Sequence, residues 1–175
     1  MIGRTTMVKM GELHVSSSAE DVFVAFGLGS CIGLALLDQR VGAAGLAHIV
    51  LPATLDSQGG QPGKFADTAV PALIDALVRL GARRTGLEAV IAGGARMFDF
   101  GSQPSATFDV GARNVEAAKT ALAAAGIPIR ASAVLGKTGR TMRLIMAQGA
   151  VTVKETGGQE ENLFVARPDR LRRAS

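Results

Sequence analysis

Continuous apolar runs dominate the first third of the chain. The segments 22–26, 32–37 and 41–51 consist largely of Val, Leu, Ala, Ile and Gly, without strict alternation of apolar and polar residues. Runs of this kind are typical of strands that are covered on both faces. Further strands are expected at 87–91, 127–135, 141–147 and 150–154.

A stripe of apolar residues with helical spacing follows the glycine-rich loop at 53–63. Its members are Val70, Leu73, Leu77 and Leu80. The spacing predicts a helix over 68–80 whose stripe faces the core. Thr68 is the expected N-cap, and Pro71 then falls in the first turn, where its missing N–H breaks no helical hydrogen bond. Gly81 is the expected C-terminal stop.

A second stripe predicts a helix over 112–125. It consists of Val115, Ala118 and Leu122. Gly126 and Pro128 are expected to end this helix. Because strands are expected before and after both helices, the pattern indicates an α/β or α+β domain with a mixed sheet.

Length and composition fit one folded domain. The chain has 175 residues, of which 47% are hydrophobic and 19% charged, and this excludes a disordered chain. It has no Trp and no Tyr, which argues against a nucleic-acid reader built on stacked aromatic rings. No uncharged stretch reaches the ~20 residues that cross a bilayer, so we expect no membrane insertion.

The basic charge is concentrated at the C-terminus. Residues 167–175 carry four arginines against Asp169, so they account for +3 of the net charge of +4. The other 166 residues are nearly neutral, at +1. We therefore expect one domain over 1–166, followed by a solvated and flexible basic tail.

Two glycine-containing segments resemble nucleotide-binding motifs, but the secondary structure expected after each segment argues against nucleotide binding. In the segment 27–33 the third glycine stands at 33, where the dinucleotide-binding pattern needs 32. The segment 131–138 matches a relaxed phosphate loop with Ala131 in place of the first glycine. Both segments lead into an expected strand, whereas both motifs need a helix there.

Cys31 and His48 are the residues best suited to chemistry. As the only cysteine, Cys31 forms no intrachain disulfide, which suits a reducing cytoplasm. Two histidines and one cysteine at scattered positions give no metal-ligand spacing, so no metal site is expected. His14 is a second candidate imidazole, but nothing in the sequence connects it to Cys31.

Cys31 ends a glycine-rich turn, and this location favours a nucleophile. A turn with little side-chain cover leaves the backbone N–H groups of Gly29, Ser30 and Cys31 free to hold an oxyanion. If 32–37 and 41–51 form a hairpin centred on 38–40, residue 31 stands opposite residue 47 or 48.

A thiol beside an imidazole can ionise near neutral pH and attack a carbonyl carbon. We therefore expect an accessible Cys31 with a pKa below ~8.5. We also expect a ring nitrogen of His48 within ~4 Å of the sulfur.

With these residues in view, the sequence resembles the CheD family, the chemoreceptor glutamine deamidases of bacterial and archaeal chemotaxis. The resemblance extends from Gly11-Glu12 to about Glu155. It is carried by the following blocks: Gly27-Leu-Gly-Ser-Cys31, Ala47-His48 with Leu51-Pro52, Pro62-Gly-Lys-Phe-Ala-Asp-Thr-Ala69, Ala92-Gly-Gly-Ala95 with Met97-Phe98, Gly111-Ala-Arg-Asn114, and Gly136 with Gly139-Arg140. Several blocks in one order with matched spacing make the resemblance specific.

The resemblance implies a fold and an activity. The fold is a single-domain α+β sandwich with α/β/β/α-like layers and mixed sheets. The activity is hydrolysis of receptor glutamine side chains to glutamate with release of ammonia, and in some members hydrolysis of glutamyl methyl esters. Cys31 takes the nucleophile position and His48 the general-base position, and no cofactor or metal is needed.

One position departs from the family pattern. A Thr that usually completes a Cys–His–Thr triad is replaced by Ala25, so a backbone carbonyl or a water is expected to contact the second nitrogen of His48. Restoring the hydroxyl with Ala25→Thr is then expected to raise the rate ~3–30-fold.

The family also implies partners. These are the cytoplasmic domains of methyl-accepting chemotaxis receptors and a CheC-type phosphatase. A non-catalytic adaptor that binds receptors or the phosphatase is the alternative to an enzyme, and an unreactive Cys31 would favour it.

Overall fold

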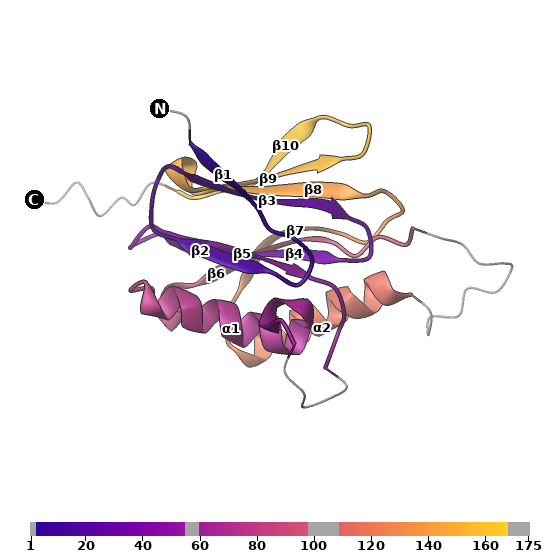
Figure 1. The fold of residues 1–175 in the computed structure, drawn as a ribbon, viewed down its shortest axis with the longest axis horizontal. Coiled ribbons are helices and arrows are strands. Elements are labelled where there is room, and N and C mark those ends of the chain that lie inside the picture. The colour runs from indigo at the N-terminus through magenta and orange to yellow at the C-terminus, as the bar shows by residue number, and fades with distance from the viewer. Residues whose placement is uncertain (1–2, 55–59, 98–108, 168–175) are drawn as a thin grey trace, which may run out of the picture.

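The computed structural model describes residues 3–54, 60–97 and 109–167. Two five-stranded sheets pack face to face, and both described α-helices cover the outer face of one of them (Figure 1). The expected α+β class with mixed sheets is confirmed, with α/β/β as the layers seen in the described part of the chain. Neither described α-helix has the length and apolar character that a membrane-spanning helix needs.

The outer sheet has the strand order β1-β3-β8-β9-β10. Its strands are β1 (Arg4–Met7), β3 (Asp21–Leu28), β8 (Arg140–Ile145), β9 (Ala150–Glu155) and β10 (Glu160–Val165). The pair β1·β3 is parallel, and the other neighbours are antiparallel.

The middle sheet, between the outer sheet and the helices, has the order β2-β5-β4-β6-β7. Its strands are β2 (Leu13–Ser16), β4 (Ile32–Asp38), β5 (Ala43–Ile49), β6 (Glu88–Gly93) and β7 (Ile129–Val134). Only β6·β7 is parallel among its neighbours.

Every residue of β4 and β5 is buried, as the continuous apolar runs predict. In β4, Ile32, Leu34 and Leu36 pack in the cluster formed with the helices. Ala35 and Leu37, at the alternate positions, pack between the two sheets. The middle sheet therefore has no solvent-facing side at these strands, which removes the need for polar alternation.

Helix α1 (Ala66–Arg79) begins two residues earlier than the sequence predicts. The expected N-cap at Thr68 is wrong, because the Thr68 hydroxyl donates to the carbonyls of Pro62 and Phe65, and Phe65 occupies the cap position. Pro71 consequently lies inside the helix, beyond the first turn. The predicted stop is confirmed, since Gly81 follows the helix with φ +94°.

Helix α2 (Val110–Ala124) also begins two residues earlier than predicted, and its buried stripe is confirmed at Val115, Ala118 and Leu122. Its N-cap is Asp109, whose carboxylate accepts from the Ala112 N–H at 2.9 Å. The helix ends before Gly126, which has φ +70°.

Three strands were not predicted from the sequence. β1 and β10 are edge strands with mostly exposed residues, and β2 is half-buried. Strands without a fully buried residue carry little hydrophobic periodicity. The predicted basic tail over 167–175 lies outside the described residues from 168 onward.

Candidate functional site

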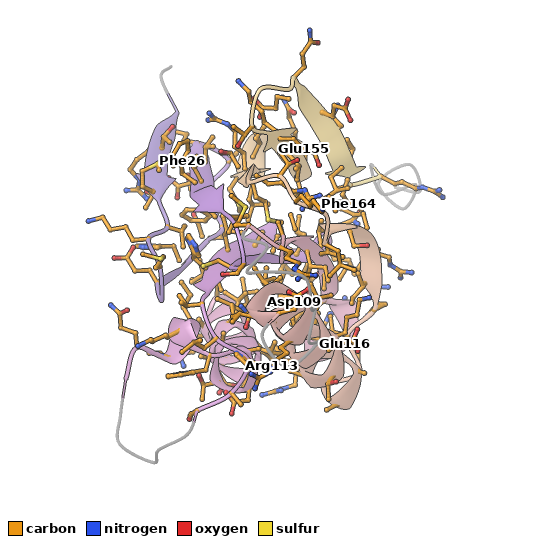
Figure 2. The ribbon with its side chains drawn as sticks, turned by 90° about the vertical axis from the view of Figure 1, so that its right-hand side faces the viewer. Phe26, Asp109, Arg113, Glu116, Glu155 and Phe164 are labelled. Carbon is orange, nitrogen blue, oxygen red and sulfur yellow. The ribbon has the colours of Figure 1, made fainter. Side chains whose placement is uncertain are left out.

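The candidate site lies at the end of the sandwich where β3 passes into β4. The connecting turn is 29–31, and this end of the molecule faces the viewer in Figure 2, with Phe26 of β3 labelled. Figure 2 also labels Asp109, Arg113 and Glu116 at the first turns of α2, which begins at the same end. The sequence blocks of the family resemblance around Cys31, after β6 and at the start of α2 therefore meet in one place.

The residues after β6 hold this turn in position. The N–H of Ala95 donates to the carbonyl of Gly29 at 2.8 Å, and the N–H of Gly94 donates to the carbonyl of Cys31 at 2.9 Å. Gly93 has φ +110°, and a Cβ there would lie 2.1 Å from the Cys31 carbonyl oxygen. Only glycine fits at this position, because any side chain would displace the turn.

Helix α2 approaches the same segment closely. A Cβ on Gly111 would lie 2.6 Å from the Gly94 carbonyl oxygen and 2.7 Å from that of Ala95. Glycine thus lets the first turn of the helix pack directly on the backbone that holds the turn 29–31.

Two of the three expected oxyanion donors are free. Within the described ranges, no carbonyl accepts from the N–H groups of Ser30 and Cys31. The N–H of Gly29 instead donates to the Gly27 carbonyl at 3.0 Å, so its predicted role as an oxyanion donor would require this hydrogen bond to break. Ser30 is half-buried, so the remaining donors lie close to the surface.

The Cys31 thiol is buried, contrary to the expectation of an accessible, acidified nucleophile. The residue is 8% exposed and belongs to the apolar cluster between the two sheets. Burial raises the pKa of the thiol, because the thiolate loses its hydration and gains no compensating partner. The thiol is therefore neutral at neutral pH.

The register of the β4–β5 hairpin differs from the predicted one. Asp38 pairs with Ala43, which leaves a loop of 39–42 and moves the centre of the hairpin towards the C-terminus. His48 consequently stands opposite Gly33 rather than Cys31.

Cys31 and His48 still share one face of the sheet. Cys31 is two residues from Gly33 and so points to the same side, which makes it the diagonal neighbour of His48. Diagonal neighbours on a sheet have Cα atoms ~7–8 Å apart and are within reach of long or aromatic side chains. The side chains of Met142 and Leu28 pack over Gly33, since a Cβ there would lie 2.6 Å from the Met142 sulfur and 3.0 Å from a Leu28 methyl carbon.

The His48 ring is oriented by a backbone carbonyl. His48 is 3% exposed, and its Nδ1 lies 3.0 Å from the carbonyl oxygen of Val8. A carbonyl only accepts, so Nδ1 carries the proton and Nε2 keeps its lone pair. The expected backbone contact to the second ring nitrogen is confirmed.

The Nε2 atom of His48 is buried and has no hydrogen-bond partner among the described residues. The imidazole and the Cys31 thiol therefore form no hydrogen bond in this structure, and the predicted distance of ~4 Å between the ring nitrogen and the sulfur stays a prediction. Burial lowers the pKa of His48, against smaller opposing effects of the Val8 carbonyl and of Glu12. The imidazole is thus a neutral base with a free lone pair.

Ala25 lies in the same layer between the sheets. It is fully buried on β3 opposite Met142, and it belongs to the same apolar cluster as Cys31. The position that usually carries Thr in the family therefore does face the inter-sheet layer, but here it provides no polar group.

Asn114 was not recognised as a functional candidate from the sequence. It is fully buried on α2, and its Nδ2 donates to the carbonyls of Ser30 and Val50, at 2.9 Å each. A signal was present, because Asn114 is four residues before Ala118 and so interrupts the apolar stripe of the helix with a polar side chain.

The remaining titratable groups form no second centre in the described part of the chain. The His14 Nε2 lies 3.4 Å from a Glu12 carboxylate oxygen, and none of the described contacts joins it to Cys31. No group of three or more His, Cys, Asp or Glu with metal-binding geometry is found in the described ranges.

Alkylation of Cys31 by iodoacetamide is expected to be slower than alkylation of glutathione at neutral pH. Only the thiolate reacts, and burial both covers the sulfur and raises its pKa. Intact-mass spectrometry over time gives the rate, and the urea-unfolded protein serves as a control that should react like glutathione. A folded-state rate above that of glutathione would contradict the buried, neutral thiol.

Comparison with known proteins places this sequence in a family. A family model described as "CheD chemotactic sensory transduction" matches residues 50–155. A protein of Symbiobacterium thermophilum named "Probable chemoreceptor glutamine deamidase CheD" is 44% identical over 163 residues, covering 91% of this chain and 98% of the relative. A protein of the same name from Methanococcus vannielii is 41% identical over 156 residues, covering 89% and 97%.

Proposed function

Because this chain belongs to the CheD family, we propose that it is a cysteine hydrolase that deamidates glutamine side chains of chemotaxis receptors. The observation that carries the mechanism is the arrangement at the β3–β4 turn. Among the described residues, the N–H groups of Ser30 and of Cys31 itself have no acceptor, and Cys31 shares a sheet face with a neutral His48 whose Nε2 has no partner there. The proposed catalytic unit is the domain over 1–166, acting in the cytoplasm.

Acylation begins with attack of the Cys31 sulfur on the glutamine side-chain carbonyl carbon. Nε2 of His48 takes the thiol proton as the S–C bond forms, and the N–H groups of Ser30 and Cys31 hold the oxyanion. The C–N bond then breaks, and the imidazolium gives its proton to the leaving ammonia. The product of this half-reaction is a glutamyl thioester.

Deacylation uses the same groups in reverse. Nε2 of His48 takes a proton from water as the water oxygen attacks the thioester carbonyl. The C–S bond breaks, the proton returns to sulfur, and the receptor side chain leaves as glutamate. A glutamyl methyl ester would follow the same path with methanol as the leaving group.

The pKa shifts favour proton transfer during attack over a resting thiolate–imidazolium pair. Burial raises the pKa of Cys31 and lowers that of His48, so both groups are neutral before substrate binds. Rotation of the thiol towards Nε2 brings the diagonal neighbours together when the substrate carbonyl arrives. General-base catalysis supplies ~10²–10⁴-fold and each oxyanion donor ~10²–10³-fold.

Met97 is the side chain that a receptor glutamine would meet at the turn. It is 46% exposed, and its Cγ lies 2.9 Å from where a Cβ of Gly29 would be. A flexible, partly exposed methionine can move aside for an incoming side chain.

A non-catalytic adaptor remains the second candidate, favoured by the buried thiol and by the missing thiol–imidazole hydrogen bond. In this function the same surface would bind receptor cytoplasmic domains or a CheC-type phosphatase. The two candidates differ in whether receptor glutamines change.

The deciding experiment incubates the purified protein with a receptor cytoplasmic domain. The enzyme hypothesis expects ammonia release and conversion of specific glutamines to glutamate, located by peptide mass spectrometry. Binding to the receptor domain with unchanged glutamines would establish the adaptor and overturn the hydrolase.

Ala25→Thr is expected to leave the deamidation rate unchanged or to lower it, in contrast to the increase that the family pattern implies. Nδ1 of His48 already donates to the Val8 carbonyl, so an added hydroxyl has no ring proton to accept. Added atoms in this fully buried layer cost ~1–3 kcal/mol in the free energy of unfolding. Urea unfolding and kcat/KM measure the two effects, with the exposed Phe26→Thr as control. A faster enzyme would show that residue 25 orients the base.

A further inference from the structure

The side chain of Asn114 joins the two segments that carry the proposed catalytic residues. Its Nδ2 donates one hydrogen to the carbonyl of Ser30, immediately before Cys31, and the other to the carbonyl of Val50, two residues after His48. The side chain comes from α2, which reaches these segments because Gly111 lets its first turn pack closely on the backbone after β6. A single amide group therefore connects helix, nucleophile turn and the end of β5.

The contact with Ser30 acts directly on an oxyanion donor. The Ser30 carbonyl and the Cys31 N–H belong to one planar trans peptide and point in opposite directions. Holding the carbonyl towards α2 therefore directs the Cys31 N–H away from the helix. A hydrogen bond to the carbonyl also polarises the peptide and strengthens its N–H as a donor.

The other half of the amide supports a role beyond packing. Oδ1 of Asn114 is buried and has no hydrogen-bond partner among the described residues. A buried oxygen without a hydrogen-bond partner destabilises a fold. If position 114 only had to fill space, an apolar side chain would therefore be more stable there than asparagine. Asparagine has the reach and the two N–H groups that these carbonyls require, whereas aspartate has the same shape and no such donors.

We propose that Asn114 is a positioning residue for the deamidation reaction. It fixes the orientation of the Cys31 N–H towards the oxyanion and sets the separation between the Cys31 turn and the His48 strand. This inference rests on the proposed function. Because the printed hydrogen bonds of Asn114 go to backbone carbonyls and not to the sulfur, we expect its loss to lower kcat rather than to weaken receptor binding.

The test compares Asn114→Asp, which keeps the shape and loses the donors, with Asn114→Ser, which keeps one hydroxyl donor. Leu122→Ala is the matched control, because Leu122 is equally buried on the same helix but lies two turns further from the site. The readouts are kcat and KM on a receptor cytoplasmic domain, thermal unfolding, and the NMR shift of the Cys31 amide.

Asn114→Asp is expected to lower kcat ~10–100-fold with little change in KM, part of the full effect of an oxyanion donor. The Cys31 amide resonance is expected to shift in both Asn114 variants. Leu122→Ala is expected to lower the unfolding temperature while kcat and the Cys31 resonance stay unchanged. Folded Asn114 variants with wild-type kcat, or with an unshifted Cys31 amide, would overturn the proposal.

Two further measurements distinguish a failure of this proposal from a failure of the proposed function and from misfolding of the variants. If the wild-type protein deamidates no receptor glutamine, the proposed function fails, and the Cys31 amide shift still reports whether Asn114 holds the turn. If both variants misfold, hydrogen exchange of the wild-type Asn114 side-chain amide decides. Slow exchange of both Nδ2 protons supports the bridge, and rapid exchange of either overturns it.

Discussion

Replacing Cys31 with alanine is expected to lower deamidation by at least ~10³-fold, to the background of the assay. The covalent route is lost completely, because the chain has no second cysteine that can replace the thiol. The fold should survive, since alanine is apolar and removes only the sulfur from a cluster that already contains Ala25, Ala35 and Ala44. Ammonia release and peptide mass spectrometry measure the activity.

Cys31→Ser is the informative companion to this variant. It keeps the position and the hydrogen-bonding capacity but places a weaker nucleophile on the turn, so it is expected to be nearly as inactive as the alanine variant. Both variants should still bind the receptor domain. Substantial deamidation by folded Cys31→Ala would show that the nucleophile lies elsewhere.

His48→Gln is expected to lower kcat ~10²–10⁴-fold, the usual contribution of a general base. The glutamine amide can still donate to the Val8 carbonyl, so the local fold is kept while the basic nitrogen is removed.

The pH dependence of the wild-type rate provides a second test of His48. The rate should fall only at a pH below ~6.5, because burial lowers the pKa of the imidazole and only the neutral ring accepts the thiol proton.

The direction of this pH dependence follows from the two pKa shifts. As the pH falls through the lowered pKa of His48, the ring gains a proton and the rate decreases. On the alkaline side the raised pKa of Cys31 keeps the thiol neutral beyond ~8.5, so the plateau is broad. The acid limb should be absent in the residual activity of His48→Gln.

Glu12→Gln provides a control for this interpretation. The negative charge of Glu12 raises the pKa of His48, so its removal should move the acid limb to still lower pH without changing the plateau rate. If the fall in rate at low pH persists in the His48→Gln variant, a group other than His48 controls the rate in that pH range.

The sequence by itself determined the elements whose signals are local. Uninterrupted apolar residues along the chain predicted β4 and β5. Apolar residues at helical spacing predicted α1 and α2. Gly81 and Gly126 mark helix ends through their own backbone conformation. The family resemblance, carried by ordered blocks, was confirmed by relatives that cover most of the chain.

The geometry of the candidate site was decided by tertiary structure. The hairpin register depends on the loop, which is 39–42 rather than the predicted 38–40, and this shift places His48 opposite Gly33 instead of Cys31. The burial that raises the pKa of Cys31 comes from a second sheet, of which β8 and β9 are distant from Cys31 in the sequence.

The two contacts that organise the site are also long-range. Val8 is 40 residues from His48, and Asn114 is 84 residues from Ser30. A local pattern reports which face of a strand or helix is apolar, whereas these hydrogen bonds exist only after the layers have packed. For this reason the sequence identified Cys31 and His48 as candidates, while only the packed sandwich fixed the tautomer of the imidazole and the orientation of the turn that carries Cys31.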